Sequence, residues 1–195
     1  IIENYVNELG VECFRGNSKN VLDRFYQCAK KYSFSTIVRI TADNPFNDPT
    51  VVDSVIKKFK LNDFDYITNS RPRTFPQGIS VEVFSFNALE ISWQNAQLPS
   101  EKEHVTPYIY NNLQEFKIFN YALDNNLSHL RWTVDRKNDY ELSKNIALNI
   151  QKFPITINDI LNLFEQKPEL IDINSDHDVD EGYKKSLQED QDLLN

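Results

Sequence analysis

The chain has 195 residues, 40% of them hydrophobic, and its 21 Lys and Arg against 29 Asp and Glu give a formal net charge of −8. This length suits one domain with a hydrophobic core, and no run of 18 apolar residues predicts a membrane span. The acidic balance, without a basic stripe, excludes the usual nucleic-acid binder. Because Cys13 and Cys28 cannot make a disulfide framework, we expect a cytoplasmic protein.

The first third of the chain alternates helical and strand patterns. Apolar residues at helical spacing predict helices over 1–9, from 17 or 18 to 32, and over 49–59, the last with Pro49 in its first turn. Short apolar or β-branched runs predict strands over 11–14, 35–41 and 64–68. This alternation is typical of βαβ units, so we expect an α/β domain with a mostly parallel sheet.

The pattern changes at residues 69–78, a loop rich in Pro and Arg. Further strands are predicted over 79–84, 116–121 and 129–135, and further helices over 86–96, 137–151 and 156–165. We therefore predict one α/β domain over residues 1–173, followed by a polar, acidic tail over 174–195.

Three tail aspartates, Asp176, Asp178 and Asp180, have the spacing of a calcium-binding loop. An EF-hand loop requires Gly at its sixth position and Glu at its twelfth, where this chain has Glu181 and Leu187. We reject a calcium site there.

Two other aspartates lie at the carboxyl ends of predicted strands: Asp43 in "TADNP" and Asp135 in "TVD". Ligands of open parallel sheets bind outside the carboxyl ends of the strands, so two parallel strands would place both carboxylates on one rim. Two carboxylates beside ligand phosphates suit Mg²⁺. Taken singly, each aspartate favours a structural interpretation, as a helix cap or an Asx turn.

Three arginines are candidate ligand contacts. Arg39 lies within the predicted strand 35–41, so it either contacts an anionic ligand or pairs with a buried acid. Arg71 and Arg73 form a local cationic pair before "FPQG" that suits a sugar carboxylate. The alternative for both is a solvated loop position.

Gly78, Glu82 and His104 complete the candidate substrate-binding residues. Gly78 permits a turn before the strand at 79–84. Glu82 alternates with two valines, so it faces away from them, toward a sugar pocket or a subunit contact. His104 precedes "VTPYIY" and is either a ligand or interface residue or a structural histidine at a helix end.

Five segments occur in an order and at a spacing that match a known family: "FRGNSKNVLDRFYQCAKKY", "IVRITADNPFNDPTVVDSVI", "RTFPQGISVEVFSFNALE", "EKEHVTPYIY" and "SHLRWTVDRKNDYEL". Together they resemble the spore coat polysaccharide biosynthesis protein F family. This family is a branch of the nucleotidyltransferases that includes the CMP-sialic acid and CMP-Kdo synthetases. The resemblance covers almost the whole chain.

The resemblance implies a Rossmann-like nucleotide-diphospho-sugar transferase fold with a mostly parallel mixed sheet. It implies a cytidylyltransferase that joins CTP to an acidic sugar and releases pyrophosphate, for cell-surface polysaccharide or glycan biosynthesis. Asp43 and Asp135 would be the catalytic and metal-binding carboxylates, with Mg²⁺ as the cofactor. By analogy, two copies would form a homodimer through residues 72–110.

The sequence departs from the family pattern at two places, and each departure changes what we expect of the chain. The family's opening loop, of the form Q-A-R…S-x-R-L-P-x-K, has no match here, so we expect a sheet without its first β-α-β unit and little activity from this chain alone. Ser80 stands where the family often has Asp in G-x-D-x-E, which weakens the assignment of that strand to the sugar site.

Two alternative functions stay open at this point. A metal-dependent glycosyltransferase of similar fold would need a D-x-D motif, and "TADNP" has a single Asp. A non-catalytic remnant that binds a partner subunit would explain the unmatched phosphate loop.

Overall fold

The computed structural model describes residues 1–175 and 181–194, which form two compact units. The first unit contains residues 1–37, 85–115 and 181–194, and the second contains residues 38–84 and 116–175. Asp176, Asp178 and Asp180 lie outside the described residues. Within those residues, no helix has the length and apolar character needed to cross a bilayer.

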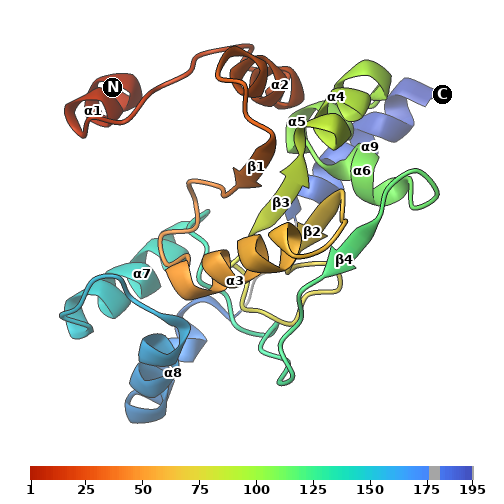
Figure 1. Ribbon diagram of the computed structural model, residues 1–195. Coiled ribbons are helices and arrows are strands. Elements are labelled where there is room, and N and C mark those ends of the chain that lie inside the picture. Colours follow the sequence, from red (N-terminus) through yellow and green to blue (C-terminus); the bar gives the residue numbers. More distant parts are fainter. Residues whose placement is uncertain (176–180, 195) are drawn as a thin grey trace. The chain divides into compact units, whose positions relative to one another are not determined.

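Four short strands form one sheet in the order β1–β3–β2–β4: β1 (Thr36–Arg39), β2 (Tyr66–Thr68), β3 (Glu82–Ser85) and β4 (Ile118–Asn120) (Figure 1). Strand β2 is parallel to β4 and antiparallel to β3. The α/β class is thus confirmed, but the sheet is mixed and not mostly parallel. The reason is the connection 69–81, which contains no crossover helix, so the chain returns antiparallel.

The second unit buries its core between this sheet and four helical segments: α3 (Pro49–Lys60), α7 (Lys137–Asn149), α8 (Ile157–Gln166) and the 3₁₀ helix η1 (Pro168–Asn174). Helix α3 packs against β2 (Figure 1). The almost completely buried side chains of this core include Val55, Ile67, Ile79, Trp132, Ile146 and Ile160. Each contributes about 1.5–3 kcal/mol of transfer free energy, so the core holds the site loops on a firm base.

One buried carboxylate joins two helix starts of this unit. Asp48 is 3% exposed; its Oδ1 accepts a hydrogen bond from Thr50 N at 2.8 Å and its Oδ2 from Ile157 N at 2.9 Å. These amides have no intrahelical partner, so Asp48 caps α3 and fixes α8 beside it. The loop between β1 and α3 is therefore held firmly at its end.

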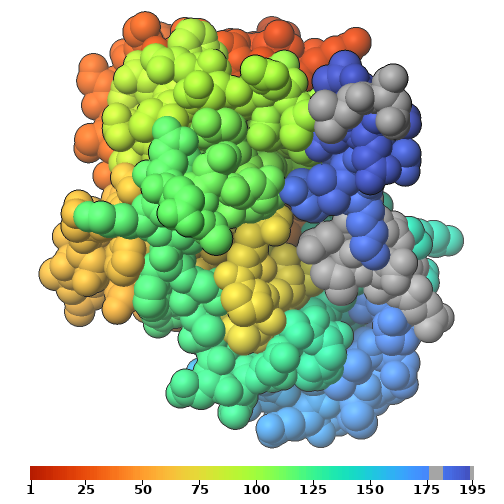
Figure 2. Space-filling view, turned by 90° about the vertical axis from the view of Figure 1, so that its right-hand side faces the viewer, coloured from red at the N-terminus to blue at the C-terminus, as the bar shows by residue number. Residues whose placement is uncertain are grey.

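The first unit is helical. Its helices are α1 (Ile2–Glu8), α2 (Val21–Lys31), α4 (Phe86–Asn95), α5 (Pro99–His104), α6 (Pro107–Asn111) and α9 (Glu181–Leu194). Tyr26 of α2 stacks on Trp93 of α4, with ring centroids 4.1 Å apart. Helix α9 lies beside α5 (Figures 1 and 2), and Asp190 accepts a hydrogen bond from Ser100 N at 2.9 Å. The segment predicted as a tail thus contains a packed helix.

Two predicted strands are wrong. Residues 11–14 pair with no described strand and are exposed or half-buried, so nothing covers an apolar strand face there. Residues 129–135 contribute only an isolated bridge between Arg131 and Gln77, because their backbone groups bond to two different loops. Helices α5, α6 and α9 were not predicted.

A carboxylate in the first turn of α8 makes stability acid-sensitive. Asp159 accepts hydrogen bonds from Lys152 Nζ and Thr156 N, both at 2.8 Å. These bonds, that from Lys152 first, lower the pKa of Asp159 from 3.8 to about 2. Because the folded-state pKa lies below the unfolded one, this stabilisation is complete above about pH 5 and is lost as the pH falls toward 2.

We therefore expect Asp159→Asn to lower the free energy of unfolding by about 1 kcal/mol at pH 7, after allowance for solvent screening. The difference from the original protein should be small near pH 2, where the pH passes through the folded-state pKa of Asp159. Urea unfolding of both proteins between pH 2 and pH 7 measures this. A difference that stays constant over that range would show that packing, and not charge, causes the loss.

Candidate active site

The turn after β1 and the segment before α7 lie side by side. Asp43 O accepts a hydrogen bond from Val134 N at 2.8 Å, and Thr133 Oγ1 approaches the same oxygen at 3.3 Å. The main chain therefore brings the turn that carries Asp43 next to the one that carries Asp135. The predicted proximity arises from these backbone contacts, and not from two adjacent parallel strands.

The loop between β1 and α3 contains buried polar atoms that lack partners. Asp43 Oδ1, Asn47 Oδ1 and Asn47 Nδ2 are inaccessible to solvent and have no hydrogen-bond partner among the described residues. An unsatisfied buried polar group costs about 1–3 kcal/mol, so three within five residues indicate a place for a ligand. Sequence reasoning missed Asn47, because an Asn in a turn looks like an ordinary turn residue.

Asp135 is held by an arginine that sequence reasoning also missed. Its side chain is 50% exposed, and its Oδ2 accepts a hydrogen bond from Arg131 Nη2 at 2.8 Å. Arg131 at the same time forms a bidentate pair with Asp139, through Nε and Nη2, both at 2.8 Å. Asp135 is therefore the accessible member of a three-residue charge network.

Asp139 is the buried anchor of this network. Burial alone would raise the pKa of its carboxyl group, but hydrogen bonds from Arg131, Asn174 and the backbone of Asp135 hold that pKa well below its usual range. The Asp139 bond in turn raises the pKa of Arg131. Both groups thus stay ionised at neutral pH.

Arg39 and Glu82 form a second, separate ion pair. Arg39 Nη1 donates to Glu82 Oε2, and Tyr66 OH donates to Glu82 Oε1 at 2.6 Å. The two charged side chains are only 17% and 10% exposed. Of the two alternatives for Arg39, the structure shows the pair with a buried acid, and Glu82 is the acid.

The loop before β3 carries three more of the predicted residues. Arg71 is exposed and its backbone N bonds to Asn120 Oδ1 at 3.0 Å, while Arg73 Nη1 donates to Ser80 Oγ at 3.0 Å. Gly78 has a φ of +105°, and a Cβ built there would lie 2.5 Å from Thr133 N. Gly78 therefore has a structural role: it lets this loop touch the segment before α7.

His104 belongs to the first unit. Its Nε2 lies 2.9 Å from Ser186 Oγ, and its ring meets the edge of Tyr183 at a centroid distance of 5.3 Å. Both partners are on α9, so His104 takes part in the packing of α5 on that helix.

Most of the chain matches one known protein family. The family model described as cytidylyltransferase matches residues 1–174. The chain belongs to the cytidylyltransferase family. It is a nucleotidyltransferase, and the family implies a nucleotide substrate of the CTP type.

Related proteins agree with this assignment. Uncharacterized protein MJ1063 from Methanocaldococcus jannaschii is 39% identical over 171 residues, which are 87% of this chain and 69% of that protein. Spore coat polysaccharide biosynthesis protein SpsF from Bacillus subtilis is 33% identical over 175 residues, 87% of this chain and 71% of that protein. The family resemblance inferred from the sequence is thus confirmed.

A solved structure supports the same fold. The structure of a cytidylyltransferase from Leptospira borgpetersenii superposes with a TM-score of 0.84 at 29% identity, covering 91% of this chain and 74% of that one. The nucleotide-diphospho-sugar transferase fold predicted for the chain is therefore confirmed.

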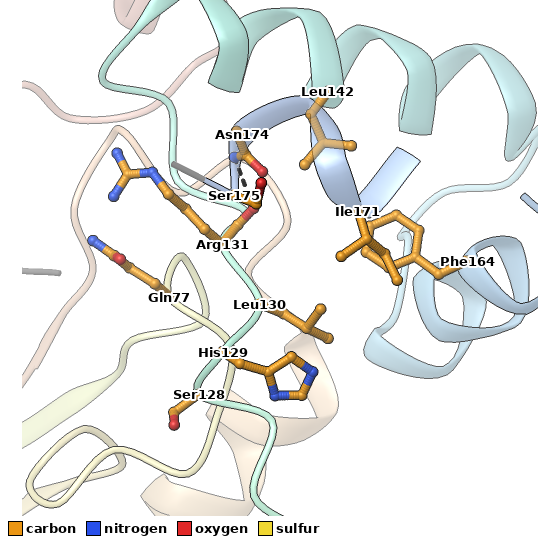
Figure 3. A pocket seen from close by; sticks show the side chains of 10 residues that line it. All are labelled: Gln77, Ser128, His129, Leu130, Arg131, Leu142, Phe164, Ile171, Asn174 and Ser175. Atoms are coloured by element: carbon orange, nitrogen blue, oxygen red, sulfur yellow. Dashed lines mark hydrogen bonds between the residues drawn. The ribbon is translucent and has the colours of Figure 1, made fainter. Parts of the chain in front are cut away.

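One cavity of this cytidylyltransferase is lined by Arg131, a member of the charge network (Figure 3). Its polar end contains Gln77, Arg131 and Asn174, and its apolar end contains Leu142 and Phe164. Its volume is about 90 Å³, whereas small-molecule sites usually enclose about 300–1,000 Å³. The cavity is thus too small for a nucleotide, and the two aspartate turns are the better candidate site.

The metal implied by the family needs carboxylates with available oxygens. Asp43 has a buried Oδ1 with no partner within the described part of the chain, and the contact of Asp135 with Arg131 uses Oδ2. Throughout residues 1–175 and 181–194, no cluster of three or more His, Cys, Asp or Glu residues is arranged to bind a metal. Two carboxylates fit Mg²⁺, which usually takes one or two from the protein and completes its coordination with phosphates and water.

Proposed function

We propose that this cytidylyltransferase activates an acidic sugar with CTP, giving a CMP-sugar and pyrophosphate, for cell-surface polysaccharide or glycan biosynthesis. A sugar hydroxyl would attack the α-phosphate of CTP, and the bond between the α- and β-phosphates would break. The polysaccharide context is supported by the name of the Bacillus subtilis relative.

One observation carries the proposal: the hydrogen bond from Val134 N to Asp43 O holds the two aspartate turns side by side. Asp43 and Asp135 would together hold Mg²⁺ against the triphosphate, and a bound Mg²⁺ would supply positive charge that offsets the phosphate oxygens. The single Asp of "TADNP" and the family match both disfavour a glycosyltransferase with D-x-D.

The sugar contact would come from the loop before β3. Arg39 is committed to Glu82, so Arg71 and Arg73 are the better cations for a sugar carboxylate. Arg73 lies against Ser80, the position where the family often has Asp. Pairing of two copies through residues 72–110 and a cytoplasmic location stay predictions.

Titration with CTP, with and without Mg²⁺, tests the proposal on Asp43→Asn. We expect magnesium-dependent binding in the original protein and a loss of about 10-fold or more in the variant, because one charged ligand is removed. Asp53→Asn, a matched charge change on the exposed face of α3, should bind as the original protein does.

Equal binding by the original protein and Asp43→Asn would refute the metal assignment. Pyrophosphate release with sugar acids and with their neutral counterparts then tests the substrate class. Equal and measurable pyrophosphate release with both kinds of sugar would refute the acidic-sugar assignment and leave the cytidylyltransferase activity intact.

A further inference from the structure

We propose that Asp139 is a positioning residue that holds Asp135 ready for the metal, acting through Arg131. The inference rests on the proposed function, since it concerns a carboxylate assigned there to Mg²⁺. Asp139 itself is 1% exposed and its two oxygens are already occupied by hydrogen bonds, so it is not a ligand.

The side-chain route runs through the guanidinium group. Asp139 fixes the plane of Arg131 by accepting from Nε and Nη2, and the same Nη2 donates to Asp135 Oδ2 at 2.8 Å. A planar guanidinium held at two points has little freedom at the third. The position of Asp135 Oδ2 is thus set by a residue four positions further along the chain.

The main-chain route is shorter. Asp139 Oδ2 accepts hydrogen bonds from the backbone N of Asp135 and of Arg136, both at 3.0 Å. Asn174 Nδ2 donates to Asp139 Oδ1 at 2.8 Å and so fixes the carboxylate from the other side (Figure 3 shows Asn174 beside Arg131). Both the backbone and the side chain of Asp135 therefore depend on Asp139.

Without the charge of Asp139, Arg131 would pair with Asp135 alone. The Arg131 side chain is only 10% exposed and needs a carboxylate partner. In Asp139→Asn, the guanidinium would pair with both oxygens of Asp135 and compete with the metal. Changes in partners that orient a metal ligand weaken metal affinity by about 10- to 100-fold, and we expect a loss of this size.

Calorimetric titration with Mg²⁺ in the presence of CTP tests the inference. Asp139→Asn should bind Mg²⁺ about 10- to 100-fold more weakly than the original protein. Asp159→Asn is the matched control, since Asp159 holds the same third position of α8 that Asp139 holds in α7; its affinity should not change. The double variant R131Q/D139N removes the competing cation but also both supports of Asp135, so it should regain only part of the lost affinity and none of the thermal stability.

The outcomes distinguish the positioning role of Asp139 from the metal site itself. An unchanged affinity in a folded Asp139→Asn, with a loss in Asp135→Asn, would overturn the inference and leave the metal site standing. No loss in Asp135→Asn would overturn both. If circular dichroism shows that Asp139→Asn does not fold, Arg131→Lys replaces it. A lysine cannot hold both carboxylates in this fork, so an unchanged affinity there would also overturn the inference.

Discussion

Replacing Gly78 by alanine should destabilise the second unit by about 3 kcal/mol or more. An added Cβ would lie 2.5 Å from Thr133 N and 2.5 Å from Trp132 C, and a backbone atom cannot rotate away as a side chain can. The φ of +105° adds strain for any residue with a Cβ. Domains of this size are stable by about 5–15 kcal/mol, so the loss is a large fraction of the total.

Chemical unfolding measures this effect, with Gly10→Ala as its control. Gly10 also has a positive φ, of +72°, but a Cβ there would meet nothing within 4 Å. The control therefore reports backbone strain alone, which should cost about 1 kcal/mol. If both variants lose the same free energy, the close contact with residues 132–133 contributes nothing.

Neutralising Glu82 should have an effect of similar size. In Glu82→Gln, the amide can still accept the bond from Tyr66 OH, but the largely buried Arg39 loses its counter-charge. Removing one partner of a buried ion pair costs about 3–5 kcal/mol, and the exposure of 17% at Arg39 places this case near 3 kcal/mol.

The double variant R39M/E82Q separates the effect of the unpaired Arg39 charge from that of packing. Because no uncompensated cation remains, it should recover most of the stability that Glu82→Gln loses. Urea unfolding of the single and double variants provides the comparison. A double variant that is no more stable than Glu82→Gln would show that the loss comes from packing around β3.

Helices were the elements best predicted from the sequence. The helices predicted over 49–59 and 86–96 agree with α3 and α4 to within one residue. The N-caps Asp48 and Ser85 mark the starts of these two helices. Strands were harder. Residues 129–135 alternate like a strand, but Trp132 N bonds to Gln77 O and Val134 N to Asp43 O. Whether such a segment joins a ladder depends on loops that come from distant sequence.

The candidate site was predicted in outline. Asp43 and Asp135 stand in recognisable turns, so their positions follow from local sequence. Local sequence does not predict the contacts among Arg131, Asp139 and Asn174. These residues become neighbours only when α7 and η1 fold onto the segment before them. An aspartate in the first turn of a helix looks like an exposed cap, and nothing local shows that Asp139 is buried.

The route of the chain also has a consequence for how the protein matures on the ribosome. The first unit is built from three separated stretches, and Asp190 reaches Ser100 across 90 residues. Synthesis proceeds at about 5–20 residues per second, so α9 is synthesised several seconds after α5, on which it packs. The second unit, by contrast, has all its described residues before α9 begins.

The two units therefore differ in when they can be completed. All described residues of the aspartate turns and their core precede α9 in the order of synthesis, whereas the first unit closes only once α9 is available. Until then Val105 and Ile109, which are fully buried in the finished protein, belong to an incomplete helical layer. Chaperone binding to nascent chains should concentrate on that layer.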